Sequence, residues 1–322
     1  MDWFERLTGF AEVEVDAQAT RRQLRVEGER LFSRVNGRSY GVGRLEVVKL
    51  AELRSRVAQL PQRPARALQA RAVRGDVRQM HQLAQHAGAL FQVASQFNLL
   101  EMVGPDVTPE DGVARYAFDR TQGPACAIAA GAATIFRNYF AQVGTQTGQT
   151  KAKQINTRAA LGAALGHDAT PLWTYRNGYA LCSRDGLARV AQRLGAADEA
   201  ARDRLRSLLE IGIHWDVEVT DAPESPGPMV SQAFCSALPV AYGESPPALW
   251  EPFARLVLEA AYEATLMAGA LNAARPGGSR QVLLTRLGGG AFGNAREWID
   301  DAIERALRLA DGFDLDVLHV TR

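Results

Sequence analysis

The strongest chemical signal in the chain is a glycine-rich segment near its C-terminus, residues 282–298, which reads VLLTRLGGGAFGNAREW. An apolar run typical of a buried strand leads into Gly288, Gly289 and Gly290, and a helix-like pattern begins soon afterwards. Glycine at such a place costs backbone entropy and adds no packing, so a ligand that needs the bare backbone is the usual reason for it. The turn exposes successive N–H groups and the helix adds its positive end, which together favour an anion such as a diphosphate.

Two common phosphate-binding motifs do not fit this segment. The sequence GGGAFGN lacks the Lys-Ser/Thr pair of the Walker loop. Its glycine spacing differs from the dinucleotide fingerprint, and it lies near the C-terminus rather than after a first strand. A tight turn without a ligand is the alternative. Four glycines in six residues, with Phe292 among them, make a ligand loop the better interpretation.

Cys126 supports a different hypothesis. The segment QGPAC places it at the start of a predicted helix, where the helix dipole would lower the pKa of its thiol. A preceding glutamine is also found in cysteine hydrolases, where its side chain helps to hold an oxyanion. A cysteine nucleophile needs a histidine, and His167 and His214 are the candidates. The alternative is that Cys126 fills a tight contact among small residues, so a cysteine hydrolase ranks third among the functions considered.

Composition describes an ordinary globular chain of 322 residues, 47% of them hydrophobic. Lys+Arg is 37 and Asp+Glu is 36, so the net charge of +1 gives no general attraction to nucleic acid or membrane. The five histidines and three cysteines show no metal-ligand spacing, and we expect no metal and no cofactor. No secretory signal or membrane span is evident, and the sparse cysteines fit a reducing compartment, so a cytoplasmic protein is expected.

Strand and helix patterns alternate through the second half of the chain, which favours a sheet with helices on both faces. The N-terminal residues 11–50 alternate apolar and polar side chains around Asn36-Gly37, which predicts a strand meander. Residues 61–79 are interpreted as a connector with a short solvated helix, and residues 145–154 as a mobile loop. Strands are predicted at 87–95, 211–220, 229–241, 280–287 and 314–321, and helices at 125–140, 249–275 and 295–311.

Four short segments resemble the ligand-binding segments of macrodomains, in the expected chain order. GAFG, residues 290–293, is similar to the family's second ligand loop, whose Gly-x-aromatic-Gly turn wraps the diphosphate of ADP-ribose. GDV, residues 75–77, resembles the motif whose aspartate accepts a hydrogen bond from the adenine amino group. FQVASQFN, residues 91–98, resembles the strand that ends beside the distal ribose. TQGPACAIAAGAA, residues 121–133, resembles the first ligand loop and its helix.

The resemblance implies an α/β fold, a three-layer α/β/α sandwich around a mixed sheet, as in macrodomains and poly(ADP-ribose) glycohydrolases. The chain is longer than a minimal macrodomain. We therefore expect one domain over residues 1–322, with an N-terminal extension at 1–60 and an insertion at 141–225. The Gly-Gly-Gly of the family's first loop and the Gln-Glu-Glu signature of the glycohydrolases are absent.

The resemblance also implies which residues hold the ligand. Asp76 would bind the adenine, Phe292 would flank a ribose, and the backbone of residues 288–294 would hold the diphosphate. Asp76 could instead cap a helix, and Asn98 could close a turn. The implied ligand-binding residues are Asp76, Ser95, Asn98, Gln122, Gly123, Gly288, Gly289, Gly290, Ala291, Phe292, Gly293 and Asn294.

The expected function is hydrolysis that removes ADP-ribose from a modified protein or nucleic acid. Cleavage at an anomeric carbon needs an oriented water and often a carboxylate near the ribose. Asp119 and Glu101 are the acids nearest the first loop, and Asp119 ranks ahead because it adjoins QGP. A non-catalytic reader of ADP-ribose is the alternative, which we rank second because the sequence shows neither a targeting partner nor a tandem array.

Overall fold

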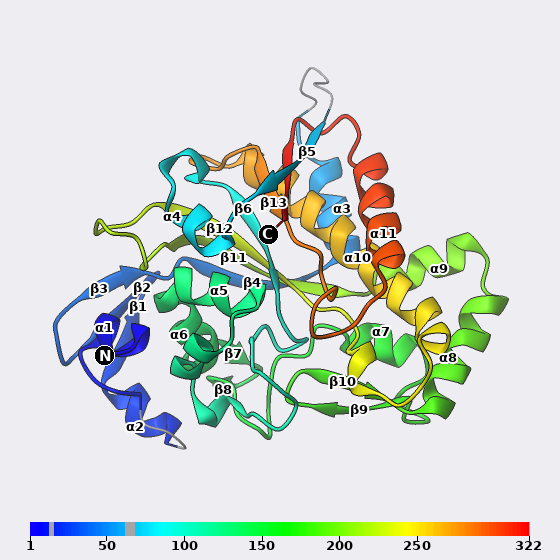
Figure 1. Ribbon diagram of the computed structural model, residues 1–322, viewed down its shortest axis with the longest axis horizontal. Helices are drawn as coiled ribbons and strands as arrows, with labels where there is room; N and C mark the ends of the chain where they lie inside the picture. The colour runs from blue at the N-terminus through cyan, green and yellow to red at the C-terminus, as the bar shows by residue number, and fades with distance from the viewer. Residues whose placement is uncertain (13–15, 62–67, 322) are drawn as a thin grey trace.

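Seven strands form one mixed sheet at the centre of the structure, a computed structural model that describes residues 1–12, 16–61 and 68–321. From one edge to the other they are β4 (Arg44–Lys49), β11 (Glu210–Glu218), β12 (Met229–Cys235), β6 (Leu90–Ala94), β13 (Gln281–Leu284), β14 (Asp316–Thr321) and β5 (Gln69–Arg74) (Figure 1). The five strands from β12 to β5 run parallel, and β11 runs antiparallel to both of its neighbours. Strands β6, β11, β12, β13 and β14 were predicted from their apolar runs, because central strands are buried on both faces.

Helices cover both faces of this sheet (Figure 1). One face carries α3 (Leu50–Ala58), α10 (Pro247–Ala274) and α11 (Arg296–Leu309), and α7 (Ala159–Ala164), α8 (Arg184–Ala196) and α9 (Glu199–Arg206) extend this side. The other face carries α4 (Val77–Gln82), α5 (Gln122–Ala129) and α6 (Gly131–Tyr139). A separate apolar cluster fills each side. The structure therefore confirms the α/β fold with three layers around a mixed sheet.

The N-terminal meander is confirmed as a three-stranded antiparallel sheet of β1 (Leu24–Glu27), β2 (Arg30–Ser33) and β3 (Ser39–Gly41). Gly37 has φ 71°, as the predicted Asn-Gly turn requires. Two short helices, α1 (Trp3–Thr8) and α2 (Ala17–Arg22), precede it, and α2 lies where the alternating pattern predicted only strands. Asp16 caps α2 through the Ala19 amide, and this local bond favours the helix. Residues 13–15 of the predicted meander lie outside the described residues.

Three other local expectations were wrong. Residues 69–74 form the exposed edge strand β5 rather than a solvated helix, and only the short α4 follows; residues 62–67 lie outside the described part. Helix 125–140 breaks at Ala130, whose ψ is 59°. The loop 145–154 is anchored: it holds β8 (Gln146–Thr147), which pairs with β7 (Gln142–Val143), and Gln149 is buried. At β5, pairing with β14, which is distant in the sequence, outweighs the local pattern.

The remaining elements are the hairpin β9 (Trp173–Arg176) and β10 (Tyr179–Cys182) and four short 3-10 helices, η1 (Ala84–His86), η2 (Pro109–Asp111), η3 (Ala114–Phe118) and η4 (Val240–Tyr242). Strands β4 and β11 belong to the central sheet although they come from the segments that we assigned to an extension and an insertion. Within the described ranges, no helix combines the length and the apolar composition that crossing a bilayer requires.

Candidate functional site

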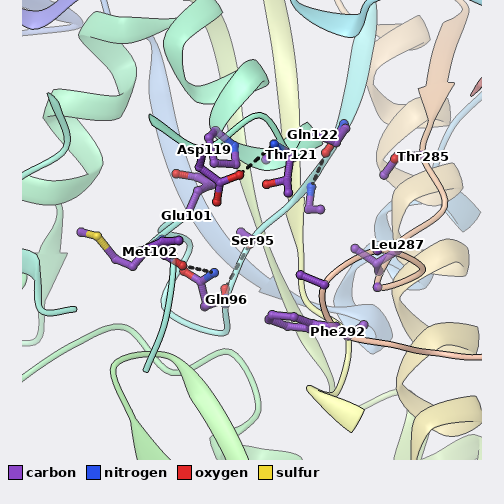
Figure 2. Close-up of a pocket in the computed structure, with 18 of the residues that line it drawn as sticks. Ser95, Gln96, Glu101, Met102, Asp119, Thr121, Gln122, Thr285, Leu287 and Phe292 are labelled. Carbon is purple, nitrogen blue, oxygen red and sulfur yellow. Dashed lines mark hydrogen bonds between the residues drawn. The ribbon is translucent and has the colours of Figure 1, made fainter. Parts of the chain in front are cut away.

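A cavity of about 150 Å³ opens at the C-terminal ends of the parallel strands β12, β6 and β13 (Figure 2). Ligands of open α/β sheets bind at this edge. The walls are the loop after β6, the start of α5, the glycine-rich loop after β13, and the rings of Tyr179 and Tyr242. The predicted site residues that line it are Ser95, Glu101, Asp119, Gln122, Gly123, Gly288, Gly290, Ala291 and Phe292. The fold therefore brings together two loops that are far apart in the sequence.

The cavity exists because the sheet opens between β6 and β13. These strands pair over only two residues and then separate. The side chain of Gln122 fills the gap: its Oε1 accepts from the Ala94 amide at 2.8 Å, and its Nε2 donates to the Gln92 carbonyl at 2.8 Å (Figure 2). The backbone of β6 thus stays paired, and α5 is fixed to the strand end. Since its carboxamide is occupied, Gln122 can offer a ligand only its backbone N–H.

The glycine-rich loop is shaped by two glycines and left open at a third. Gly288 and Gly293 have φ of 72° and 70°, a region that other residues rarely adopt. A Cβ on Gly288 would also lie 2.4 Å from the Cβ of Ala237. Gly290 has no atom within 4 Å of a Cβ position. A side chain at Gly290 would therefore enter open space beside the cavity, whereas one at Gly288 would disturb the fold.

Several backbone amides of this loop have no hydrogen-bond partner among the residues that the structure describes. Within the described part of the chain, the N–H groups of Gly288, Gly290, Ala291 and Phe292 donate no hydrogen bond, and all four residues line the cavity. The loop closes instead through the Asn294 amide, which donates to the Gly288 carbonyl at 3.0 Å. Successive free N–H groups of this kind form an anion-binding concavity.

The start of α5 supplies a second set of donors across the cavity. The N-cap residue Thr121 makes no side-chain cap, and the N–H groups of Gln122 and Gly123 have no partner in the described structure. The first N–H groups of a helix carry its positive end. Gly123 allows α5 to approach β6 closely, because a Cβ there would lie 2.0 Å from the Ala94 carbonyl oxygen. The residues of both sets of donors line one cavity.

Asp119 lies at the entry to α5, partly exposed, and lines the cavity (Figure 2). Its Oδ1 accepts from the Thr121 amide at 2.8 Å, which orients the side chain beside the helix N-terminus. Within the described structure, Oδ2 makes no hydrogen bond, so one carboxylate oxygen remains for a water or a ligand hydroxyl. The geometry therefore suits an exposed base at the rim of the cavity.

Glu101 also lines the cavity, but its side chain is fully buried. Its carboxylate pairs with Nη2 of Arg137 at 3.1 Å, and both side chains are 0% exposed. Burial raises the pKa of Glu101 to about 7, although the Arg137 charge acts in the opposite direction. A carboxyl group with this pKa exchanges protons near neutral pH, as a general acid or base must. The two predicted acids thus differ in environment: Asp119 is solvated and Glu101 is desolvated.

The raised pKa of Glu101 predicts a pH dependence of stability. Because the folded pKa lies above that of the unfolded chain, the proton on Glu101 stabilises the fold fully below about pH 4.5, and this contribution is lost as pH rises through about 7. We expect the stability of the wild type relative to Glu101→Gln to fall between these pH values and to level off above them. Urea unfolding of both proteins at intervals from pH 4.5 to 8.5 measures this difference. A constant difference would mean that Arg137 keeps Glu101 ionised throughout.

Three aromatic rings form one end of the cavity. The ring centroids of Tyr179, Tyr242 and Phe292 lie 5.4 to 5.7 Å apart. The Phe292 carbonyl accepts a hydrogen bond from the Ala241 amide at 3.0 Å, which holds Phe292 in place. Ser95 lies at the opposite side, and its hydroxyl donates to the Gln96 carbonyl at 3.0 Å. A flat or apolar part of a ligand, such as a ribose face, fits the aromatic end.

Tyr262 of α10 holds the residues that directly precede the glycine-rich loop. Its hydroxyl donates to the Thr285 carbonyl at 2.7 Å and accepts from the Leu287 amide at 2.8 Å. Tyr262→Phe removes both of these hydrogen bonds and leaves only the 3.0 Å bond from the Leu287 amide to the Thr285 carbonyl. We expect it to lower the free energy of unfolding by about 1–3 kcal/mol and to weaken ligand binding. Denaturant unfolding and calorimetry measure the two effects.

The matched control is Tyr175→Phe, which removes a single 2.7 Å bond to the Ile155 carbonyl outside the cavity. This variant should lose stability without losing affinity for the ligand. Equal binding by Tyr262→Phe and the wild type would show that the loop keeps its shape without Tyr262.

Five predicted ligand residues do not line the cavity: Asp76, Asn98, Gly289, Gly293 and Asn294. Asp76 caps α4 by accepting from the amides of Arg78 and Gln79 through Oδ1. Asn98 is fully buried and closes the turn by accepting from the Leu100 amide. The last three shape the glycine-rich loop. The structure therefore shows the capping and turn-closing interactions that we considered as alternatives.

Sequence reasoning missed several residues of the site: Arg286 lies within the segment 282–298, and three tyrosines come from other segments. Tyr179, Tyr242 and Arg286 line the cavity, and Tyr262 supports it. The pair Asn177-Gly178 is a hairpin signal that could have located β9–β10 and with it Tyr179. Tyr242, Arg286 and Tyr262 carry no local signal.

The thiol and imidazole groups of the described chain are not arranged for catalysis. Cys126 is fully buried, and burial raises the pKa of its thiol well above the usual value, opposite to the lowering expected from a helix N-terminus. His214 is buried beside Phe136, and His167 stacks on Trp173. The packing interpretation of Cys126 therefore fits better. Among the residues that the structure describes, no cluster of three or more His, Cys, Asp or Glu side chains could hold a metal ion.

The fold and the cavity define an α/β protein with a cavity at the carboxyl ends of its parallel strands. No protein-family model matches the chain, and no curated protein does. Solved structures that resemble it include poly(ADP-ribose) glycohydrolase from Thermomonospora curvata, with a TM-score of 0.46 and 13% identity, covering 94% of this chain and 91% of that one. The glycohydrolase from Deinococcus radiodurans, in complex with ADP-ribose, has a TM-score of 0.43 and 12% identity, covering 86% and 87%. Both TM-scores lie below 0.5, so the function proposed for this chain rests on its own cavity.

Proposed function

We propose that the protein binds ADP-ribose, or an ADP-ribosyl group on a macromolecule, and hydrolyses the bond at the distal ribose. One observation carries this proposal: within the described structure, two sets of residues with unpaired backbone N–H groups line one cavity, at Gly288, Gly290, Ala291 and Phe292 and at the start of α5. A diphosphate has enough acceptor oxygens to accept hydrogen bonds from both sets of N–H groups at once. A single carboxylate has too few oxygens to do so. The aromatic end then accommodates a ribose face against Phe292.

The adenine would extend from the glycine-rich loop toward β5. Strand β14 lies between β13 and β5, so the two strand ends are about 10 Å apart at the usual strand spacing. Asp76 follows β5 and uses only Oδ1 for its cap within the described structure. Oδ2 therefore remains to accept from the adenine amino group. Helix capping and adenine recognition are compatible in one side chain.

The proposed chemistry is acid–base cleavage of the glycosidic bond. Asp119 would orient and deprotonate the attacking water, since its Oδ2 is unoccupied and faces the cavity end of α5. Glu101, with its pKa near 7, would exchange the proton of the leaving group or stabilise the charge of the transition state through Arg137. Beside an oxocarbenium-like centre, a protonated carboxyl group can donate a proton to the leaving group, and a carboxylate can stabilise the positive charge.

Calorimetry with ADP-ribose is the decisive test of binding. We expect heat of binding with ADP-ribose and a weaker signal with adenosine, which lacks the diphosphate. No heat at millimolar ADP-ribose would remove the proposal. Incubation with mono-ADP-ribosylated protein and nucleic acid then tests turnover by measuring released ADP-ribose. Tight binding without release from any substrate would make the protein a reader.

The proposed partner is an ADP-ribosylated macromolecule in the cytoplasm. The three cysteines of the chain, Cys126, Cys182 and Cys235, are all free thiols in the structure, which supports a reducing compartment. The net charge of +1 gives no general attraction to nucleic acid, so recognition would rest on the ADP-ribosyl group.

A further inference from the structure

Arg286 is the one cation among the described residues that line the cavity. The charged side chains of the lining are Glu101, Asp119 and Arg286, and Glu101 is already paired with Arg137. Arg286 directly precedes the glycine-rich loop, and its carbonyl accepts from the Gly289 amide at 3.1 Å. A guanidinium at this position adds a full positive charge to the donors of the loop.

The backbone of Arg286 is fixed on both sides. Tyr262 bonds to the preceding Thr285 and to the following Leu287. The side chain has more freedom, since it is 33% exposed. Its Nη1 lies 2.7 Å from Oδ1 of Asp300, but this contact lacks hydrogen-bond geometry, and Nη1 has no hydrogen-bond partner. A guanidinium has five N–H donors, and here they are incompletely used.

The counter-ion of Arg286 is not exclusive to it. Asp300 also pairs through Oδ2 with Arg296 on α11 at 3.3 Å. If Arg286 turned toward a ligand, Asp300 would keep Arg296 and would not be left as an unpaired charge. The movement therefore costs little, because a partly exposed ion pair contributes only up to about 1 kcal/mol.

We propose that Arg286 is the cationic ligand of the diphosphate and exchanges its ion-pair contact with Asp300 for phosphate oxygens; this inference rests on the proposed function. The loop amides then set the position of the diphosphate, and Arg286 neutralises its charge. A phosphate-free ligand gains nothing from this residue. The affinity for ADP-ribose should consequently depend on salt, and Arg286 should account for part of that dependence.

The test is calorimetry of Arg286→Gln and of the control Arg308→Gln at low and high salt, with ADP-ribose and with inorganic pyrophosphate. Arg308 lies on α11 like Asp300 but pairs with Glu304, lies outside the cavity and is 64% exposed. We expect Arg286→Gln to weaken ADP-ribose binding about 10- to 100-fold at low salt and to flatten the salt dependence, since hydrogen bonds to charged groups are worth that much. Arg308→Gln should bind within about 2-fold of the wild type, as expected for an exposed charge.

Asp300→Asn gives a second, opposite readout. It frees Arg286 from its counter-ion, so ADP-ribose binding should tighten several-fold, which a purely structural role of the pair would not produce. Thermal unfolding of each variant verifies the fold. Equal affinity and equal salt dependence of Arg286→Gln and the wild type would overturn the inference while leaving the proposed function in place.

Binding of pyrophosphate distinguishes the inference about Arg286 from the proposed ADP-ribose function. If the wild type binds pyrophosphate through Arg286 but binds no ADP-ribose, the inference stands and the proposed function fails. If neither probe binds the wild type, both are overturned.

Discussion

Gly290→Val abolishes ADP-ribose binding while the protein stays folded: this is the expected result of placing a side chain in the open space beside the loop amides. No atom lies within 4 Å of a Cβ at Gly290, and its φ is not in the left-handed region, so the loop can keep its shape. The valine methyl groups would occupy the approach to the amides of Gly290, Ala291 and Phe292. Loss of two charge-assisted hydrogen bonds weakens binding by at least about 100-fold. Calorimetry with ADP-ribose measures it.

Two other glycines provide the controls for this substitution. Gly195 on α8 also has open space at its Cβ position and lies outside the cavity, so Gly195→Val should bind normally. Gly288→Val should destabilise the fold, because φ is 72° and Ala237 blocks the Cβ position. Normal binding by Gly290→Val would show that the diphosphate is held elsewhere.

Asp119→Asn should remove turnover while retaining affinity. Asparagine keeps the oxygen that accepts from the Thr121 amide, so the entry to α5 is preserved, but the charge that activates water is lost. We expect release of ADP-ribose from a modified substrate to slow by about 100- to 10,000-fold, the usual contribution of a positioned base. ADP-ribose affinity should stay within about 3-fold, since no charge-assisted bond to the diphosphate is removed. Single-turnover assays and calorimetry separate the two effects.

Glu101→Gln is the comparison for Asp119→Asn. If Asp119→Asn still turns over and Glu101→Gln does not, the desolvated carboxyl performs the chemistry and the ranking of the two acids is reversed. If both variants turn over at the wild-type rate, neither acid is the base. The pH profile of turnover adds a further check, because an acid with a pKa near 7 makes the rate change around neutral pH.

The sequence by itself determined the local features of this protein. The apolar run before Gly288 defined a buried strand, and the glycines and the pattern after them defined a turn and a helix, because these signals depend on neighbouring residues. The same reasoning located β6, β12 and α10. It placed the glycine-rich loop at the carboxyl end of a parallel strand, where the structure has it.

Only the tertiary structure decided which side chains surround that loop, and how burial affects the pKa of each. Gln122 fills the gap beside β6 across a separation of 28 residues, and Tyr262 reaches the loop from a helix 25 residues away. Arg286 became a candidate ligand only because the cavity contains no second cation among the described residues. Glu101 and Asp119 look alike in sequence, yet burial beside Arg137 raises the pKa of Glu101 while Asp119 stays partly exposed. Burial and long-range contacts depend on how the whole chain packs, which local residue patterns do not encode.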